Sequence, residues 1–382
     1  MKKLAKIILK GITWDHSRGY TPLVATAQRF MELHSDIDII WHKRSLQEFA
    51  DKPIARLAEE YDLMIIDYPW IGYGAETGQF LPLNNYLPEK FLQQQLDGTV
   101  GASYESYTHQ GQLYAIPMDA AAPVASYRPD LFQANNRKLP KTFDDVLELA
   151  SRGQVILPGI AIDTLMNFYM FCCSLGESPF QNKEAVVSTS TGVRALALYK
   201  SLIDLVDPIC FQLNPIKTYE LLSTQNRYCY CPFAYGYTNY ARPGFSSHVL
   251  HFTDLVALGE QPLISTIGGT GLAVSSSCNY KSIALDYLSF TTSPDTQAHL
   301  YFEAGGQPAH KKAWLSRPNN AATHKYFDKT LPTLERSYLR PRYNGYIHFQ
   351  DNAGEIIRNY LMNDGDPATV LSQLNHLLNH AS

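Results

Sequence analysis

The segment 13–20 combines an aromatic ring with charged side chains that could hold a small polar molecule. Trp14 offers a flat apolar face, while Asp15, His16 and Arg18 offer a carboxylate, an imidazole and a guanidinium. An aromatic face beside a few polar groups is typical of ligand pockets. The sequence therefore predicts that these four residues bind a ligand. The structural alternative places Trp14 in the core, Asp15 as a helix cap and Arg18 in solvent. A lone histidine is more often a structural hydrogen-bonding residue than a catalyst.

A second segment, Asp67-Tyr68-Pro69-Trp70, places two rings beside a carboxylate directly after a short apolar run. We predict that Tyr68 and Trp70 supply apolar faces to a ligand. The alternative is a rigid turn whose rings pack on a neighbouring helix, and ring chemistry alone does not decide between the two.

The third segment, 228–242, is rich in tyrosine, and the chain as a whole contains 25 tyrosines. Tyr235, Tyr237 and Asn239 lie beyond a predicted strand over 228–233, around Gly236. Residues on loops outside a strand are frequent binding residues, so we predict that these three line a site. The alternative is an aromatic strand followed by a loop that lies on the surface.

The elements that must position the first two segments form a β-α-β-α-β pattern. Strands are predicted over 6–14, 38–41 and 63–66, the last a continuous apolar run typical of a strand covered on both faces. A helix is predicted with Thr21 as its N-cap and Pro22 at its first position, and a capping box, Ser45-x-x-Glu48, opens the next helix. The pattern predicts a parallel sheet, with the loops at the carboxyl ends of its strands available to a ligand.

Farther along the chain the pattern changes from alternating strands and helices to mixed elements. A hairpin is predicted over 107–115 around Gln110-Gly111, and a helix is predicted after Thr142. A strand is predicted over 262–275, interrupted by Gly268-Gly269-Thr270-Gly271. These elements predict an α/β protein in which the glycine-rich return strand lies far along the chain.

Composition excludes several classes of protein. With 32 Lys and Arg against 36 Asp and Glu, the formal net charge of −4 excludes a nucleic-acid or anionic-lipid partner. No apolar run approaches the roughly 18 residues of a membrane span, so no membrane insertion is expected. The apolar run at residues 7–9 ends at Lys10, which predicts a cytoplasmic protein if Met1 is the true start and a periplasmic or extracellular one if the chain was shortened. The six cysteines show no common disulfide pattern and are expected to be reduced and buried.

Motifs for catalysis and cofactors are missing from the sequence. It contains no zinc-ligand spacing, no phosphate-binding P-loop and no nucleophile elbow. The glycine-rich segment 268–271 lacks the spacing of a dinucleotide-binding fingerprint. We therefore expect no metal, no cofactor and no catalytic residue, although a triad assembled from distant residues would leave no such pattern.

At the level of the whole chain, the order of several motifs resembles the bacterial extracellular solute-binding proteins of the maltose-binding type, which are partners of ABC importers. The motifs are segment 13–20, Asp62 to Asp67, Tyr114 to Asp119, Tyr127 to Phe132, Thr142 to Val146, Gly268 to Val274, Gly306 to Ala309 and Arg340 to Ile356.

The resemblance implies a two-lobed α/β fold of the type II periplasmic-binding-protein kind, with a mixed sheet and flanking helices in each lobe. Lobe one would comprise 1–117 and 265–312, and lobe two 118–264 and 313–382. A ligand, either carbohydrate-like or carboxylate-bearing, would bind reversibly in an interlobe cleft, and the lobes would close on it by a hinge motion. The implied partners are this ligand and an ABC permease, for a protein that is itself monomeric.

The resemblance also assigns roles to residues at the predicted site. Asp15, Asp119 and Asn239 would orient hydroxyl groups, and Arg18 or Arg342 would pair with a carboxylate. Gly269 and Thr270 would lie at the site on the return strand. Sugar-binding relatives often carry tryptophan where this chain has Thr270, so Trp14, Trp70 or Tyr235 would have to supply the stacking ring. The alternative function is a cytosolic enzyme, an enzyme accessory or a solute sensor that reuses the fold.

Overall fold

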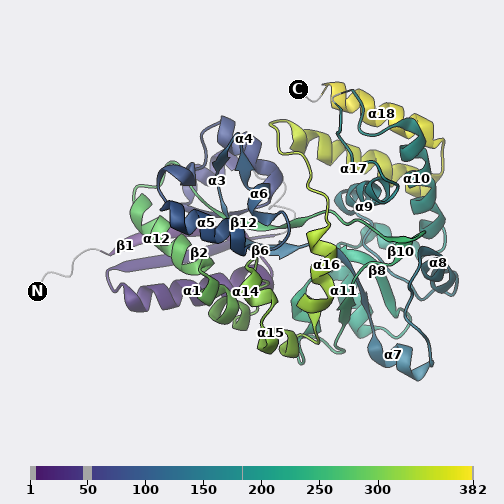
Figure 1. Ribbon diagram of the computed structural model, residues 1–382, viewed down its shortest axis with the longest axis horizontal. Helices are drawn as coiled ribbons and strands as arrows, with labels where there is room; N and C mark the ends of the chain where they lie inside the picture. The colour runs from purple at the N-terminus through teal and green to yellow at the C-terminus, as the bar shows by residue number, and fades with distance from the viewer. Residues whose placement is uncertain (1–5, 46–53, 183, 381–382) are drawn as a thin grey trace, which may run out of the picture. The chain divides into compact units, whose positions relative to one another are not determined.

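The computed structural model describes residues 6–45, 54–182 and 184–380 (Figure 1). The predicted helix that opens with the capping box Ser45-x-x-Glu48 falls largely outside the described residues. The chain divides into two compact units. Unit 1 comprises the described residues of Met1–Ala120, Gly268–Asn320 and Arg342–Asn344, and unit 2 comprises those of Ala121–Ile267, Ala321–Pro341 and Gly345–Ser382.

Unit 1 is built on a five-stranded mixed sheet with the strand order β2-β1-β3-β12-β6. The strands are β1 (Ile7–Trp14), β2 (Ile37–Arg44), β3 (Leu63–Ile66), β6 (Ile116–Ala121) and β12 (Gly268–Val274). β1 runs parallel to both β2 and β3, whereas β12 is antiparallel to β3. All four residues of β3 are buried, as its continuous apolar sequence predicts. The three strands of the predicted β-α-β-α-β start are confirmed, and so is the parallel pairing of β1 with β2 and β3.

The first helix of unit 1 begins earlier than the sequence predicts. α1 (Ser17–Leu33) has His16 as its N-cap, whose Nδ1 accepts a hydrogen bond from the backbone N–H of Arg18 (3.0 Å). Thr21 and Pro22 therefore lie inside the helix, and the prediction of Thr21 as the N-cap was wrong. The Thr21 hydroxyl donates to the carbonyl of Ser17 (2.6 Å), which is how threonine bonds within a helix.

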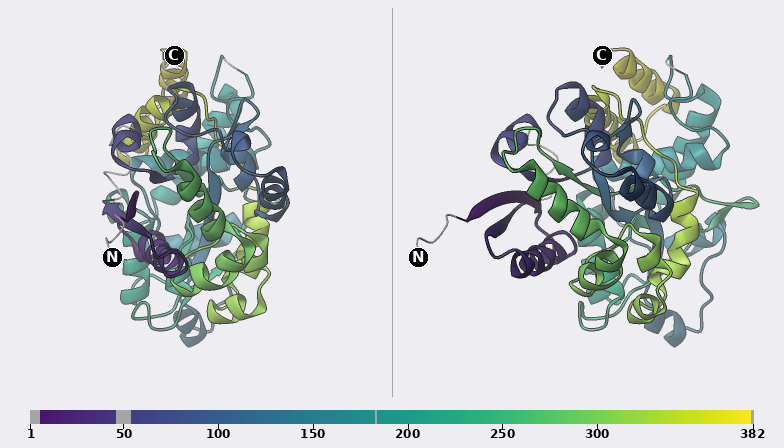
Figure 2. Two further views of the ribbon diagram at one scale, coloured as in Figure 1. Left: turned by 90° about the vertical axis from the view of Figure 1, so that its left-hand side faces the viewer. Right: turned by 60° about the vertical axis from the view of Figure 1, so that its left-hand side comes forward.

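Helices cover the sheet of unit 1, and α1 packs beside β2 and α12 (Lys281–Thr292), as the views in Figure 2 show. The predicted hairpin is confirmed: β4 (Thr108–His109) and β5 (Gln112–Leu113) pair through Gln110 and Gly111, both with positive φ. The other elements of unit 1 are α3 (Ile54–Glu60), η1 (Tyr68–Trp70), α4 (Ile71–Glu76), η2 (Leu83–Asn85), α5 (Glu89–Gly98), α6 (Ser103–Ser106), α13 (Pro294–Thr296), η5 (Gln297–Tyr301), α14 (Lys311–Trp314) and most of α15 (Arg317–Ala322).

Unit 2 has a three-stranded antiparallel sheet with the order β8-β7-β9. Its strands are β7 (Pro123–Tyr127), β8 (Tyr230–Tyr235) and β9 (His251–Thr253), with a separate hairpin of β10 (Ala257–Leu258) and β11 (Gln261–Pro262). Its helices are α7 (Pro129–Ala134), α8 (Phe143–Ser151), α9 (Ala161–Ser174), α10 (Thr189–Ile203), η3 (Pro208–Gln212), α11 (Pro215–Thr224), η4 (Thr238–Ala241), α16 (Tyr326–Glu335), α17 (Tyr346–Asn363) and α18 (Pro367–His380).

Aromatic rings fill much of the core of unit 2. Phe171 of α9 contacts both Tyr199 and Phe233, with ring centroids 5.7 and 5.9 Å away, and these two rings also contact each other. α17 packs directly against α9, because Gly354 leaves room for the chain at Ala161: a Cβ atom on Gly354 would lie 2.5 Å from the Ala161 carbonyl oxygen. Thr142 caps the predicted helix α8, and Asp145 Oδ2 accepts a hydrogen bond from the backbone N–H of Thr142 in return.

The unit boundaries differ in detail from the predicted lobes. The division points after Ala120 and Ile267 lie close to the predicted ends at 117 and 264, while the third lies after Asn320 rather than 312. Residues 342–344 were predicted in lobe two but group with unit 1. The reason is a close backbone contact, since a Cβ atom on Gly72 of α4 would lie 1.8 Å from the Arg342 carbonyl oxygen.

Among the helices that the structure describes, none has the length and apolar content required to span a bilayer.

Candidate ligand-binding residues

Trp14 is the last residue of β1, and its ring packs within unit 1. The residue is 5% exposed, and a Cβ atom on Gly19 would lie 2.5 Å from the indole ring. The first turn of α1 therefore covers one part of the ring. This is the core placement that the sequence left open as an alternative, and the role of Trp14 toward a ligand stays a prediction.

Asp15 lies at the surface and forms an ion pair with Lys43 (2.7 Å), whose ammonium group lies over the Tyr20 ring. It does not cap α1, because His16 occupies that position. Burial and the neighbouring Arg18 lower the pKa of His16 to about 4, so its imidazole is neutral at pH 7 and suited to accept the capping hydrogen bond.

Arg18 and Asp119 bind each other in the interior of unit 1. The Arg18 Nε donates to Asp119 Oδ2 (2.7 Å), and Arg18 Nη2 donates to Asp119 Oδ1 in a second, parallel bond. Both side chains are almost fully buried, at 5% and 0% exposure. Burial raises the pKa of the Asp119 carboxyl, and the adjacent guanidinium opposes that rise. The alternative of a solvated Arg18 is thus wrong, and the two groups predicted to face a ligand face each other.

The second segment forms η1 at the carboxyl end of β3. Asp67 caps it, with Oδ1 accepting from the backbone N–H of Tyr68 (2.9 Å). The Tyr68 ring is buried and meets Tyr107 edge to face at 6.3 Å, whereas Trp70 is only half-buried and meets Tyr73 at 5.8 Å. Trp70 therefore keeps part of its surface accessible, while Tyr68 packs within the unit.

The return strand β12 reaches the same end of β3, where Gly271 pairs with Ile66. It is a continuous strand rather than the interrupted one that the sequence predicts. Gly269 has a φ of +107°, and a Cβ atom there would lie 2.2 Å from the Asp119 carbonyl oxygen, so the position requires glycine. The next residue, Thr270, is half-buried, and its Oγ1 is buried with no hydrogen-bond partner among the described residues.

Arg342 joins these residues from the far end of the chain. Its backbone lies against Gly72, directly after η1 and Trp70. The side chain is half-buried, and its Nη1 is buried without a hydrogen-bond partner in the described part of the chain. Burial lowers the pKa of Arg342, while the charges of Glu105 and Tyr68 act in the opposite direction. Unit 1 thus brings Tyr68, Trp70 and Arg342 together, with Thr270 on the strand paired to β3.

In unit 2, the three predicted residues differ in accessibility. Tyr235 is half-buried, and its hydroxyl lies 3.2 Å from Thr266 Oγ1. Tyr237 and Asn239 are buried, at 7% and 2% exposure, and the Tyr237 ring lies 6.2 Å from that of Tyr219. Within unit 2, Tyr235 is therefore the most accessible of the three.

The sequence missed two residues that border this part of unit 1. Tyr107 contacts the Tyr68 ring, and a Cβ atom on Gly271 would lie 2.7 Å from the Tyr107 ring. Glu105 contributes the nearby negative charge at Arg342. Neither belongs to a local motif with its partner. These residues are brought together only by the antiparallel pairing of β12 with β3 and by the contact of segment 342–344 with Gly72.

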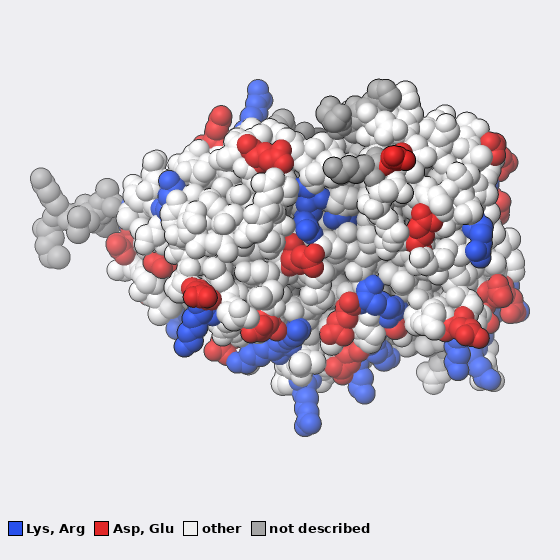
Figure 3. Space-filling model, turned by 45° about the horizontal axis from the view of Figure 1, so that its top comes forward, with Lys and Arg blue, Asp and Glu red and all other residues white. Residues whose placement is uncertain are grey.

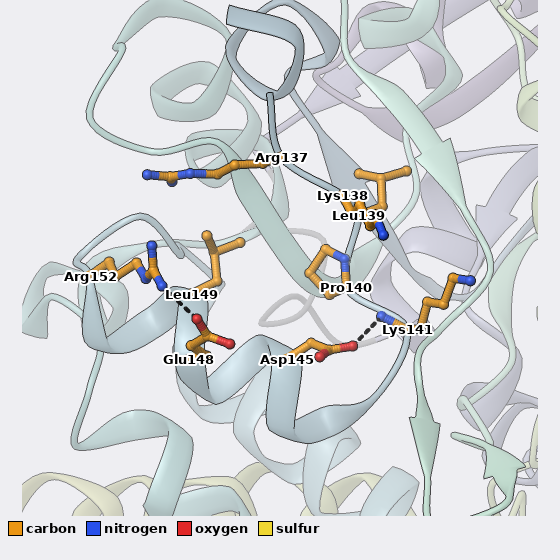
Figure 4. Close-up of a pocket in the computed structure, with 9 residues that line it drawn as sticks. All are labelled: Arg137, Lys138, Leu139, Pro140, Lys141, Asp145, Glu148, Leu149 and Arg152. Carbon is orange, nitrogen blue, oxygen red and sulfur yellow. Dashed lines mark hydrogen bonds and ion pairs between the residues drawn. The ribbon is translucent and has the colours of Figure 1, made fainter. Parts of the chain in front are cut away.

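A separate surface pocket lies in unit 2, beside α8 and the segment that precedes it (Figure 4). Its volume is about 480 Å³. It is lined by Arg137, Lys138, Leu139, Pro140, Lys141, Asp145, Glu148, Leu149 and Arg152. The two carboxylates are engaged: Asp145 accepts from the backbone N–H of Lys141, and Glu148 pairs with Arg152. None of the predicted site residues lines this pocket.

Charged side chains of both signs are interspersed on the face of the molecule in Figure 3, without an extended area of one sign. Among the described residues, no three His, Cys, Asp or Glu side chains are grouped as metal ligands would be. All six cysteines are buried, as predicted.

A family model for bacterial extracellular solute-binding proteins matches residues 25–326. The chain belongs to this family. The predicted two-lobed α/β solute-binding fold is confirmed by solved members, although their sequences differ widely from this one. A solute-binding protein of Agrobacterium radiobacter in complex with ribitol is 19% identical and has a TM-score of 0.82, with 98% of each chain covered. Maltose-bound MalE3 of T. maritima is 16% identical, with a TM-score of 0.83 and coverage of 98% of this chain and 99% of that one.

Two curated solute-binding relatives match shorter stretches. A maltotriose-binding protein of Pyrococcus abyssi is 26% identical over 126 residues, which is 33% of this chain and 26% of that protein. A mannitol-binding protein of Pseudomonas aeruginosa is 28% identical over 128 residues, covering 32% of this chain and 28% of that protein. The matched segments thus span only about a quarter of these relatives.

Proposed function

We propose that this solute-binding protein reversibly binds a small polyhydroxylated molecule and serves as the receptor of an ABC importer. Family membership supports a binding role, and the relatives described above carry names or bound ligands of the sugar and polyol class. The observation that carries the proposal for this chain concerns two buried polar atoms of unit 1, Thr270 Oγ1 and Arg342 Nη1, which have no hydrogen-bond partner among the residues that the structure describes. Buried polar groups without partners are unfavourable, so a ligand that binds them is favoured.

Within the proposed site in unit 1, Trp70 supplies the accessible ring surface, and Thr270 and Arg342 supply hydrogen bonds. The role of Tyr235 in unit 2 remains assigned by sequence. Trp14, Asp15, His16, Arg18, Tyr68 and Asp119 support this part of unit 1, and Tyr237, Asn239 and Gly269 remain assigned by sequence. An aromatic face against the C–H face of a sugar, with polar groups at its rim, is a common arrangement in carbohydrate sites.

Thermal unfolding in the presence of sugars, polyols and organic acids tests the proposal. A ligand at 100 times its Kd stabilises the folded state by about 2.7 kcal/mol, which is a readily measured shift in Tm. A library without any stabilising compound would contradict the proposal. Binding that disappears in Trp70→Ala while the fold is retained would support the assignment of the ring.

We propose that the protein does not transform its ligand. The family is described as one of binding proteins, and binding alone accounts for the groups named above. NMR spectra of a stabilising compound after prolonged incubation with the protein provide the test. New resonances that depend on the protein would instead favour the enzyme alternative.

For the compartment, we propose the extracellular or periplasmic side, because the family is described as extracellular. The permease partner and the monomeric state follow from the same family role. Fractionation of cells expressing the unmodified gene tests the compartment, and recovery in the cytoplasm would contradict it. Co-purification with a membrane permease and light scattering in solution test the other two.

A further inference from the structure

We infer that the solute carries a carboxylate, as a sugar acid does, and that Arg342 is the residue that binds it. The inference rests on the proposed function and specifies its ligand class. It differs from what the structural relatives suggest, since ribitol and maltose are neutral.

The first argument is that Arg342 lacks an acceptor where comparable arginines have one. The buried residues Arg18, Arg128 and Arg340 donate to Asp119, Asp130 and Gln350, respectively. Arg342 makes no hydrogen bond or ion pair with any described residue, although its Nη1 is buried. A buried guanidinium nitrogen without an acceptor is unfavourable, so the position favours a ligand that accepts a hydrogen bond there, and a carboxylate is a strong acceptor of this kind.

The second argument is that the position of Arg342 is fixed. The Arg342 carbonyl lies so close to Gly72 that position 72 has no room for a side chain. This backbone contact holds segment 342–344 against α4. A guanidinium on an anchored backbone can bind a carboxylate through two parallel hydrogen bonds with little further ordering.

The third argument concerns the other cation of this region. Arg18 is already paired with Asp119 through two parallel hydrogen bonds, donated by its Nε and Nη2. A ligand carboxylate at Arg18 would have to displace a buried ion pair, whereas Arg342 offers an unoccupied donor. Between the two arginines that the sequence left open, the contacts therefore favour Arg342.

The fourth argument concerns the rest of the ligand. Trp70, which directly precedes α4, keeps part of its surface accessible, and the Thr270 hydroxyl has no hydrogen-bond partner within the described ranges of the chain. A simple inorganic anion bound to Arg342 would contact neither the Trp70 ring nor the Thr270 hydroxyl. A polyhydroxylated chain or ring that ends in a carboxylate could use the ring, the hydroxyl and the guanidinium.

The experiment measures thermal shifts and calorimetric affinities of the full chain with matched probe pairs at constant ionic strength. The pairs are D-gluconate against D-glucitol, D-glucuronate against D-glucose, and glycerol 3-phosphate against glycerol, with sodium sulfate as a simple anion. We expect a sugar acid to bind and its neutral partner to bind at least about tenfold more weakly, as the loss of a charged hydrogen bond implies.

Arg342→Gln should weaken binding of the sugar acid by about 10- to 100-fold and weaken binding of its neutral partner much less, because a charged hydrogen bond is stronger than a neutral one. Without ligand, the same variant should unfold at an equal or higher temperature than wild type, because it removes a guanidinium whose buried Nη1 has no hydrogen-bond partner in the described part of the chain. A lower Tm would mean that the protein itself satisfies the guanidinium, and would overturn the inference. Arg342→Lys keeps the positive charge but cannot donate two parallel hydrogen bonds to one carboxylate, so it should bind the sugar acid with intermediate affinity.

Arg152→Gln is the matched control, since it removes an arginine from the surface pocket in Figure 4. The inference is overturned if this control, rather than Arg342→Gln, abolishes binding, or if sulfate stabilises as well as gluconate. Equal binding of neutral and acidic partners also overturns it, while leaving the proposed function intact. Binding of phosphate esters alone, lost in Arg342→Gln, would support the anion site and replace carboxylate by phosphate. A complete absence of binding by these probes and the wider library would contradict the proposed function itself.

Discussion

Arg18 and Asp119 lie 101 positions apart in the sequence and meet as a bidentate pair in the core of unit 1. In such a pair, the attraction between the charges offsets a large desolvation penalty. The pair connects α1 to β6. Removing one partner of this buried pair should therefore destabilise the fold far more than removing one partner of a surface pair.

Asp119→Asn should therefore lower the free energy of unfolding by about 3–5 kcal/mol, because it leaves the Arg18 guanidinium buried and unpaired. The matched control is Asp15→Asn, which removes the exposed ion pair with Lys43 and should cost no more than about 1 kcal/mol. Urea unfolding of the two variants gives both values. Equal losses would show that burial of the Arg18–Asp119 pair is not what makes it important.

A second buried carboxyl predicts a dependence of stability on pH. Burial raises the pKa of Asp163 in α9 to about 8, and its Oδ2 has no hydrogen-bond partner in the described part of the chain. The unfolded group titrates near 4, so between about pH 4 and pH 8 the folded state holds a proton that the unfolded state lacks. The resulting stability is complete below pH 4 and is lost as the pH rises toward 8.

Asp163→Asn should remove this dependence. Relative to wild type, the variant should gain about 1.4 kcal/mol for each pH unit between 4 and 8. Tyr199 and Cys231, which lie close enough to interact with Asp163, are neutral over this range because burial raises the pKa of both. Urea unfolding at pH 5.0 and 7.5 measures the difference, and parallel profiles for the two proteins would contradict the prediction.

At the scale of elements, Gly269 joins β12 to β6 at a distance that no other residue allows. A Cβ atom there would meet the Asp119 carbonyl oxygen at 2.2 Å, and the φ of +107° is itself unfavourable for other residues. Gly269→Ala should lower the stability by more than the roughly 1 kcal/mol that backbone strain alone costs.

Gly78→Ala separates the two effects, because Gly78 also has a positive φ, +68°, but has no atom within 4 Å of the added methyl group. Only the cost of its backbone conformation should remain. Chemical denaturation of both variants provides the comparison. Similar losses at the two positions would argue that the contact of β12 with Asp119 can relax.

Local sequence patterns predicted several elements of unit 1 because each depends on neighbouring residues. The apolar run of β3 and the Gln110-Gly111 turn are examples. The start of α1 was missed because His16 is an uncommon N-cap whose role depends on its neutral imidazole. The Arg18–Asp119 pair and the surroundings of the Arg342 guanidinium could not be predicted from spacing, since only the folded chain brings these distant segments together.

At the scale of the whole molecule, the chain passes between the two units after residues 120, 267, 320, 341 and 344. The family resemblance implies that a solute-binding protein changes conformation on binding its ligand. We predict that a saturating ligand lowers the radius of gyration in solution, because closure is driven by a higher affinity of the ligand for the closed state. Small-angle scattering with and without a stabilising compound measures it, and an unchanged radius would contradict closure.

Because its six cysteines are buried, the native protein should react little with thiol-specific labels. Burial raises the pKa of every one of these thiols, for instance to about 12 for Cys173 and Cys210, so the reactive thiolate is scarce at neutral pH. Ellman's reagent should release almost no colour from the folded protein and six equivalents after denaturation. A cysteine introduced at an exposed position such as Lys138 would then be the single position labelled by a maleimide dye in the folded protein.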